Sequence, residues 1–205
     1  LDIIEKHGSW NITNKNWTGD SWVLERILAR VFVDLQTSAF LGLGVSPSFF
    51  NTSETFITIG GGISGYERNL LDKEQFQSII AQQPVENENV DYFKSYRDLM
   101  STTFKLLGSN SNIEEEVNRV VDLEKEFANV KKKFDNSKPR QFKKNVKFMT
   151  LDELNALTSS KFNWTMYVEE ILLGTRITIP ANLKFMVLLP NNIKTIVDWI
   201  ADKPK

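Results

Sequence analysis

The sequence predicts a mainly α-helical protein with a few short strands. Two capping boxes support this prediction, one at Ser111 and Glu114 and the other at Thr150 and Glu153. In such a box the cap hydroxyl and the glutamate three residues later each accept a backbone N–H at a helix start. Apolar residues that recur every three to four positions are the other support, because this spacing is typical of helices that bury one face.

The first half of the chain predicts helices interrupted by one strand. A helix is expected to begin at Trp22, capped by Asp20 or Ser21, and to fade through glycines 42 and 44 before Pro47. The β-branched residues at 55–59 predict a short strand. A short helix is expected at 73–82 and a longer one at 91–107, whose apolar side carries Tyr92, Tyr96, Leu99, Met100 and Leu107.

The second half predicts four further helices. The helix after Ser111 carries an apolar stripe formed by Ile113, Val117, Val120, Val121, Phe127 and Ala128. A loop at 135–147 leads to helices at 151–157 and 164–173, and segments 176–179 and 184–189 are expected to be extended. Pro190 suits the first turn of a last helix, whose apolar side carries Ile193, Ile196, Val197 and Ile200.

Composition excludes several classes of protein. With 205 residues, 41% hydrophobic and 25% charged, the chain has the make-up of a soluble globular protein with one domain or two small ones. No apolar run approaches the ~18–20 residues of a transmembrane helix. A net charge of −1 argues against a general binder of nucleic acid or anionic membranes. The chain begins with Leu1 and shows no signal peptide, so we expect it to start inside a longer protein.

Two compositional signals disagree about the cellular compartment. The absence of cysteine is typical of a reducing compartment. Four glycosylation sequons favour an extracellular or cell-surface location instead, although sequons also arise by chance in an asparagine-rich chain. They lie at Asn11, Asn16, Asn51 and Asn163.

Several segments, in order, resemble the helical N-terminal region of the neprilysin family of zinc metallopeptidases, which includes endothelin-converting enzymes. They are residues 1–10 (LDIIEKHGSW), 123–128 (LEKEFA), 148–154 (FMTLDEL), 162–167 (FNWTMY) and 185–190 (FMVLLP). The chain departs from the family pattern at Ser9, where a glycine is usual, and at Asn192, where a tyrosine is usual. The resemblance spans nearly the whole chain.

The resemblance implies a fold and a function. Residues 1–205 would be a partial helical lobe of the family's N-terminal domain, incomplete at both ends. The parent protein would be a zinc metalloendopeptidase that cleaves small extracellular peptides, and its zinc and catalytic residues would lie in a separate catalytic domain of the same polypeptide. The family usually carries disulfides in this region, which this chain lacks. The alternative is a stand-alone secreted module that binds peptides or a partner without catalysis.

We expect no catalytic, cofactor-binding or metal-binding residue in this chain. A zinc peptidase of this kind needs two histidines one helical turn apart with a glutamate between them. The only histidine is His7, so no such motif exists, and there is no cysteine to replace a ligand. His7, just before Gly8, is expected to be a helix-terminus residue.

Three other features have a functional and a structural interpretation. Residues 60–65 (GGGISG) match a dinucleotide-binding pattern, but a poor helix start follows, so flexible turns after a strand are favoured. Glu124 lies on an apolar stripe and needs a partner, such as Arg97 or Arg119. A run of basic residues could bind polyanions. The favoured interpretation is structural: the first lysines complement the dipole at a helix C-terminus, and the others lie in a solvated loop. The run comprises Lys131, Lys132, Lys133, Lys138, Arg140, Lys143, Lys144 and Lys147.

Overall fold

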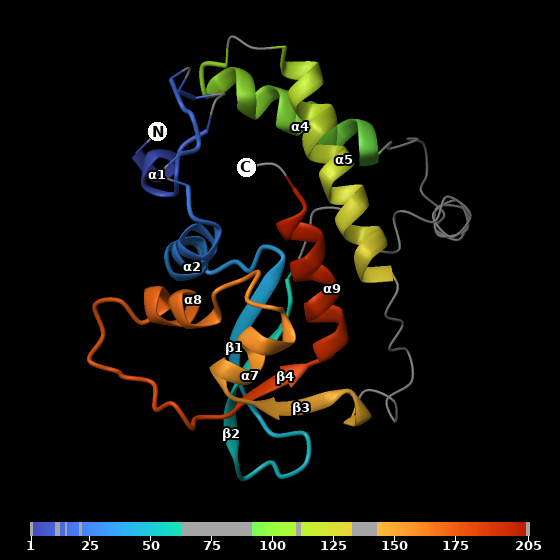
Figure 1. Ribbon diagram of the computed structural model, residues 1–205. Helices are drawn as coiled ribbons and strands as arrows, with labels where there is room; N and C mark the ends of the chain where they lie inside the picture. The colour runs from blue at the N-terminus through green and yellow to red at the C-terminus, as the bar shows by residue number, and fades with distance from the viewer. Residues whose placement is uncertain are drawn as a thin grey trace. The chain divides into compact units, whose positions relative to one another are not determined.

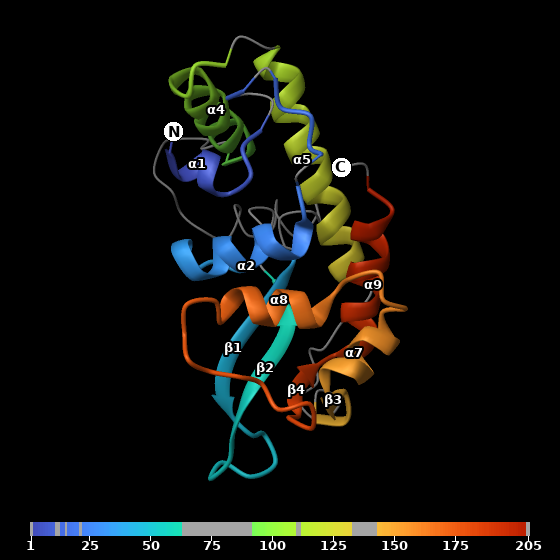
Figure 2. The same cartoon turned by 60° about the vertical axis from the view of Figure 1, so that its left-hand side comes forward.

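The computed structural model describes residues 2–10, 13–14, 16–20, 22–62, 92–109, 112–132 and 143–203. It divides the chain into two compact units, which Figures 1 and 2 show with their element labels. The first unit comprises residues 1–21 and 65–129, and the second comprises residues 22–64 and 130–205. No helix in the described ranges is long and apolar enough to cross a membrane.

The first unit is helical. It contains α1 (Asp2–Lys6), α4 (Tyr92–Leu106) and most of α5 (Ile113–Lys132). Helices α4 and α5 share a buried cluster of Met100, Phe104, Val117 and Val121. Trp10 closes one side of this cluster, because its ring meets that of Phe104 edge-on with centroids 5.1 Å apart. The predicted apolar stripe of α5 is therefore confirmed.

Helix α5 is capped by Asn112. The Asn112 carbonyl accepts the first helical hydrogen bond from the Glu116 N–H at 3.1 Å, and its side-chain oxygen accepts from the Glu115 N–H at 3.4 Å. Glutamates at 114–116 place negative charge at the positive end of the helix dipole. Ser111, the predicted cap, lies outside the described residues.

Glu124 on α5 has a hydroxyl partner. The Tyr96 hydroxyl donates to the two carboxylate oxygens at 3.0 and 3.1 Å. The prediction named Arg97 or Arg119; Arg97 donates to Asn118, and Arg119 pairs with acids in the first turn of α5. The need for a partner is thus confirmed, and Tyr96 meets it.

The second unit is built on a four-stranded mixed sheet. Its strands are β1 (Leu41–Pro47), β2 (Thr55–Gly61), β4 (Phe185–Leu188) and β3 (Val146–Met149), in that spatial order. β1 and β2 form an antiparallel hairpin, β2 and β4 run parallel, and β4 and β3 run antiparallel. About half of the described residues are helical, so the fold is mixed and only in part the mainly α fold that the sequence predicted, and the strands form a larger sheet than expected.

Among the described residues, the helices that accompany the sheet include α2 (Leu24–Leu35), α7 (Leu151–Leu157), α8 (Trp164–Ile171) and α9 (Pro190–Ala201). Helices α2 and α8 lie side by side, α9 contacts β2, and α7 contacts β3 and α8. Pro190 occupies the first turn of α9 as predicted. Phe185, Met186 and Val187 of β4 are fully buried, so this strand is the centre of the core.

Two strands lie where the sequence predicted other structure. Helix α2 ends at Leu35, because Gln36 adopts a left-handed conformation with φ 54° and donates its N–H to Phe32. Residues 41–47, predicted as the fading end of this helix, alternate apolar and small residues and pair with β2. Residues 146–149 form β3, although the first two were predicted as the end of a loop and no element was predicted for the other two.

Other predicted elements also differ. The N-cap of α2 is Val23, which has no side-chain cap bond, rather than Asp20. Leu99, predicted on the buried side of α4, is 62% exposed, and Phe104 is buried in its place. Residues 176–179 form no strand. Ser21, the helix predicted at 73–82 and the residues after Gly62 in the glycine motif lie outside the described residues.

The turn from β3 into α7 is held by the predicted capping box. The Thr150 N–H donates to a Glu153 carboxylate oxygen at 2.8 Å, and the Glu153 N–H donates to the Thr150 hydroxyl at 3.3 Å. Both halves of the box are present, so it fixes the angle at which α7 leaves the sheet edge.

An aromatic cluster fills the space around α8. Phe162, Trp164 and Tyr167 are fully buried, with ring centroids 4.7 to 6.2 Å apart and tilted planes. The Trp164 ring N–H donates to the buried Thr158 hydroxyl at 3.2 Å. The Tyr167 hydroxyl is buried without a hydrogen-bond partner in the described part of the chain. Burial raises the pKa of Tyr167 to about 12.

Helix α2 is joined to α8 by ionic contacts. Glu170 of α8 accepts from Arg30 at 3.0 Å and lies 3.8 Å from Arg26. Glu25 of α2 accepts from the Asn163 N–H at 2.8 Å, at the start of α8. Because Glu170 is only 12% exposed, its charge needs these partners, and they orient the two helices.

Thr150→Ala is expected to destabilise the second unit. The substitution removes the hydroxyl that accepts the Glu153 N–H, which costs about 1 kcal/mol at an N-cap. Urea unfolding followed by tryptophan fluorescence measures the change. Thr103→Ala is the matched control, because the exposed Thr103 hydroxyl donates to the Leu99 carbonyl of its own helix and caps no helix start. Equal unfolding midpoints for Thr150→Ala and the wild type would contradict the role of the box.

Tyr167→Phe is expected to leave the protein as stable or more stable at pH 7, because it removes a buried hydroxyl without a partner. The native pKa of about 12 lies above the unfolded value, so the wild type loses stability as the pH rises from about 10 to 12. At pH 11 this effect lowers the free energy of unfolding of the wild type by about 1.4 kcal/mol, and the variant should not show this decrease.

Urea unfolding at pH 7 and pH 11 measures this difference. Tyr96→Phe is the control: its hydroxyl bonds to Glu124, so its removal should cost stability at pH 7. An equal decrease in the free energy of unfolding between pH 7 and pH 11 in Tyr167→Phe and the wild type would refute the raised pKa of Tyr167.

Candidate functional site

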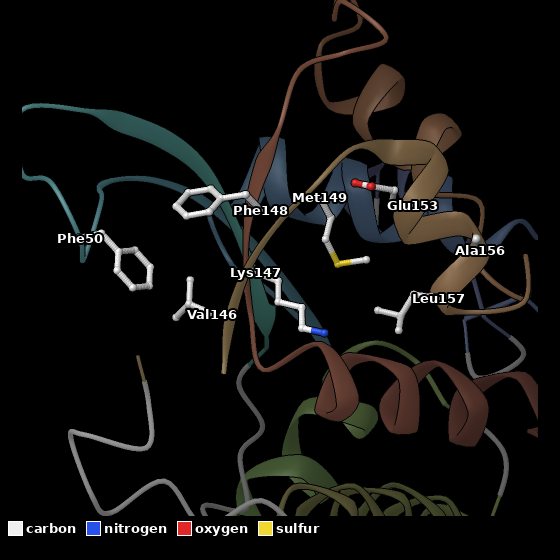
Figure 3. Close-up of a pocket in the computed structure, with 8 residues that line it drawn as sticks. All are labelled: Phe50, Val146, Lys147, Phe148, Met149, Glu153, Ala156 and Leu157. Atoms are coloured by element: carbon white, nitrogen blue, oxygen red, sulfur yellow. The ribbon is translucent and has the colours of Figure 1, made fainter. Parts of the chain in front are cut away.

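An open groove of about 700 Å³ follows β3 in the second unit (Figure 3). It is formed by the tip of the β1–β2 hairpin, by β3 and by α7. Its lining residues are Phe50, Val146, Lys147, Phe148, Met149, Glu153, Ala156 and Leu157. Because β3 continues directly into the capping box of α7, most of the groove comes from one continuous segment of chain.

The groove has two apolar walls. In Figure 3, Phe50, Val146 and Phe148 lie on one side, and Met149 with residues 156 and 157 of α7 lies on the other. Successive side chains of a strand point to opposite faces, so the walls belong to the two faces of the sheet and the groove straddles its edge. Sequence reasoning missed this site because it assigned residues 135–147 to a loop.

The first wall is fixed by aromatic packing. The Phe148 ring lies 4.7 Å from Phe56 of β2 and 5.9 Å from Phe50, between ring centroids. Phe50 nevertheless stays 56% exposed at the hairpin tip. An exposed aromatic ring beside a hollow is a feature that binding surfaces use, because covering it removes apolar area from water.

A second hollow, of about 370 Å³, lies over the glycine-rich part of β1 and β2. Gly60 and Gly61 belong to β2, so they are not the flexible turns that the sequence predicted. A Cβ on Gly62 would come within 2.5 Å of the Ser38 carbonyl oxygen, so close backbone packing requires this glycine. Lys131 donates to the Gly62 carbonyl at 2.9 Å, which gives this member of the basic run a structural role.

The predicted glycosylation residues are dispersed. Asn11 lies outside the described residues, and Asn16, Asn51 and Asn163 are exposed. Asn51 lies in the turn between β1 and β2, where its side-chain oxygen accepts the Ser53 N–H at 3.2 Å. Asn163 caps α8 with its side-chain oxygen.

His7 lies at the end of α1, as predicted. Its Nδ1 atom is 2.6 Å from the Ile3 carbonyl oxygen one helical turn earlier. Within the described ranges, the structure contains no group of three or more histidine, cysteine, aspartate or glutamate residues that could hold a metal ion.

A charged cluster lies at the C-terminal helix. Asp198 of α9 bonds to Lys161 at 2.8 Å and to Lys194 at 2.6 Å. The hydrogen bond from Lys161, and after it the one from Lys194, holds the pKa of Asp198 below its ordinary value. The bond between Lys161 and Asp198 also raises the pKa of Lys161. The cluster connects the segment before α8 to α9, which is a structural role.

Comparison with known proteins identifies the family. The chain matches the N-terminal model of peptidase family M13 over residues 1–205. Its fold resembles that of the zinc metalloprotease Zmp1 of Mycobacterium tuberculosis in an open state, with a TM-score of 0.64 and 18% identity. The match covers 99% of this chain and 29% of the Zmp1 chain. No curated protein sequence matches. The chain belongs to peptidase family M13, which confirms the resemblance to neprilysin-like zinc metallopeptidases.

Proposed function

We propose that this chain is a non-catalytic part of the N-terminal domain of an M13 zinc metalloendopeptidase that cleaves small extracellular peptides. The observation that carries the proposal is the family match over all 205 residues, combined with a span of only 29% of Zmp1. A catalytic domain of the same polypeptide is the partner that this proposal requires, and zinc would be bound there.

The chemistry of this chain supports the division of roles. A catalytic zinc site normally takes three protein ligands and leaves a fourth position open for water or substrate. This chain has one histidine and no cysteine. His7 lies beside a backbone carbonyl at the end of α1. In this proposal the chain contributes to the shape of the peptidase, and the zinc ligands come from the catalytic domain.

The alternative function is a stand-alone secreted module that binds peptides or a partner without hydrolysis. The open apolar groove along β3, with Phe50 exposed beside it, favours this alternative. The end of the transcript separates the two functions. Continuation beyond Lys205 into a segment with two histidines one helical turn apart supports the peptidase, and a stop codon behind a secretion signal supports the module.

The purified 205-residue chain, incubated with zinc and a quenched fluorogenic peptide, is expected to show no chelator-sensitive hydrolysis, because it cannot supply three zinc ligands. Zmp1 under the same conditions is the positive control. Chelator-sensitive turnover that survives repurification, and that is lost in His7→Ala, would show that this chain holds a metal site.

We expect secretion from eukaryotic cells to yield a glycosylated chain, because the exposed sequon at Asn51 is an acceptor for glycan in the secretory pathway. Asn51→Gln should then lower the mass by one glycan, measured by mass spectrometry before and after endoglycosidase treatment. Thr52→Ala is the matched control, since it changes the same turn and keeps the sequon. A secreted chain without glycan at Asn51 would contradict the assignment of this site.

A further inference from the structure

We propose that the outer edge of β3 binds an extended peptide as an additional, antiparallel strand, with the peptide's carboxyl end at the lysines that precede β3. Strand addition of this kind obtains affinity from backbone hydrogen bonds and specificity from pockets for alternate side chains. The proposal goes beyond the M13 assignment, because binding at this edge needs neither zinc nor a catalytic domain.

The backbone of β3 has an unpaired outer side. β3 is the last strand of the sheet, and no described residue pairs with its other edge. The Leu189 N–H donates to the Asn145 carbonyl at 2.8 Å, one position before the first ladder pair. Bonded and non-bonded pairs alternate in an antiparallel ladder. Lys147 and Met149 therefore bond to β4, and the N–H and C=O groups of Val146 and Phe148 face the open edge.

The groove lies where a strand paired with this edge would place its side chains. An added strand continues the pleat, so its side chains point alternately to the two faces of the sheet. One set would contact Phe50 and Phe148, and the other would contact Met149 and Leu157 (Figure 3). A small compact ligand would use one wall only, whereas an extended peptide uses both walls and the backbone between them.

Charge sets the direction of the peptide. Lys143 and Lys144 are exposed just before β3, and Lys147 is exposed within it. Asp152 and Glu153 lie beyond the other end of the strand, in the first turn of α7. A peptide that runs antiparallel to β3 brings its carboxylate to the lysines and its amino end to the acids. A parallel peptide would place like charges together at both ends.

The capping box keeps the edge open. The bonds between Thr150 and Glu153 turn the chain away from the sheet directly after Met149, so α7 forms a wall rather than a continuation of the strand. The four residues of β3 offer two outward residues, which matches a peptide of about five or six residues.

The test uses a hexapeptide with free ends, Arg-Val-Phe-Val-Leu-Glu, titrated calorimetrically into the purified chain. Two N-methylated versions, each methylated at alternate residues, test the backbone pairing. The version that loses the N–H groups facing β3 should bind about tenfold more weakly, and the other should bind like the parent. The charge-swapped hexapeptide Glu-Val-Phe-Val-Leu-Arg, amidated at its carboxyl end, should also bind more weakly.

Two protein variants test the location. Lys147→Glu and Phe50→Ser change exposed positions and should weaken binding several-fold. Their matched controls, Lys125→Glu and Leu173→Ser, change exposed residues outside the groove and should bind like the wild type. Unchanged urea unfolding of each variant confirms that the fold is kept.

Three results would overturn the proposal. One is the absence of binding by the parent hexapeptide, and another is equal weakening by the two methylated versions. The third is self-association of the chain, measured by sedimentation without peptide and lost in Lys147→Glu, because a second copy of β3 would then be the occupant. None of these measurements depends on hydrolysis, so a failure here leaves the assignment as a peptidase domain unaffected.

Discussion

The pairing of β2 with β4 is the constraint on which the second unit depends. These strands run parallel and meet at Thr58 with Met186 and at Ile59 with Val187, positions far apart in the sequence. Parallel neighbours need a long connection, and here the chain between them contains α4, α5, β3, α7 and α8, of which the last three belong to the second unit. Since Ile59 and Val187 are fully buried, losing this pairing would expose the centre of the core and detach the hairpin from the other strands.

The same arrangement explains why a groove exists at β3. With β4 in the middle, β3 becomes an edge, and edge strands carry unpaired backbone groups. Proteins commonly cover such an edge or shorten the strand. Here β3 is only four residues long and carries the exposed Lys147, which limits uncontrolled pairing, while α7 and Phe50 leave the edge accessible. Its shortness and its charge are thus the features that protect this edge in the described structure.

Local signals in the sequence predicted the helices well and the sheet poorly. The box at Thr150 was predicted in full, since both of its bonds join residues three apart. β1 was mistaken for the fading end of a helix, because it follows the apolar helical pattern of α2 closely in the sequence. The alternation of Leu41 and Leu43 with glycines acquires meaning only through the partner strand β2. β3 was missed because its four residues pair with β4, about forty positions later. The groove depends on β3 and was missed with it.

Polar groups in the two units show how the chain is stabilised without disulfides. Glu124 and Glu170 are each bonded, to Tyr96 and to arginines, so these carboxylates contribute to packing rather than weakening it. Ser9, Tyr167 and Asn192 are among the exceptions, each buried with an unpartnered side-chain oxygen among the described residues. Asn192 stands where family members usually carry tyrosine, at the first turn of α9. The chain can therefore keep the order of the family motifs and still carry a different residue at a buried position such as 192. Strand pairing and helix caps set the fold, and they do not require every side chain that is usual in the family.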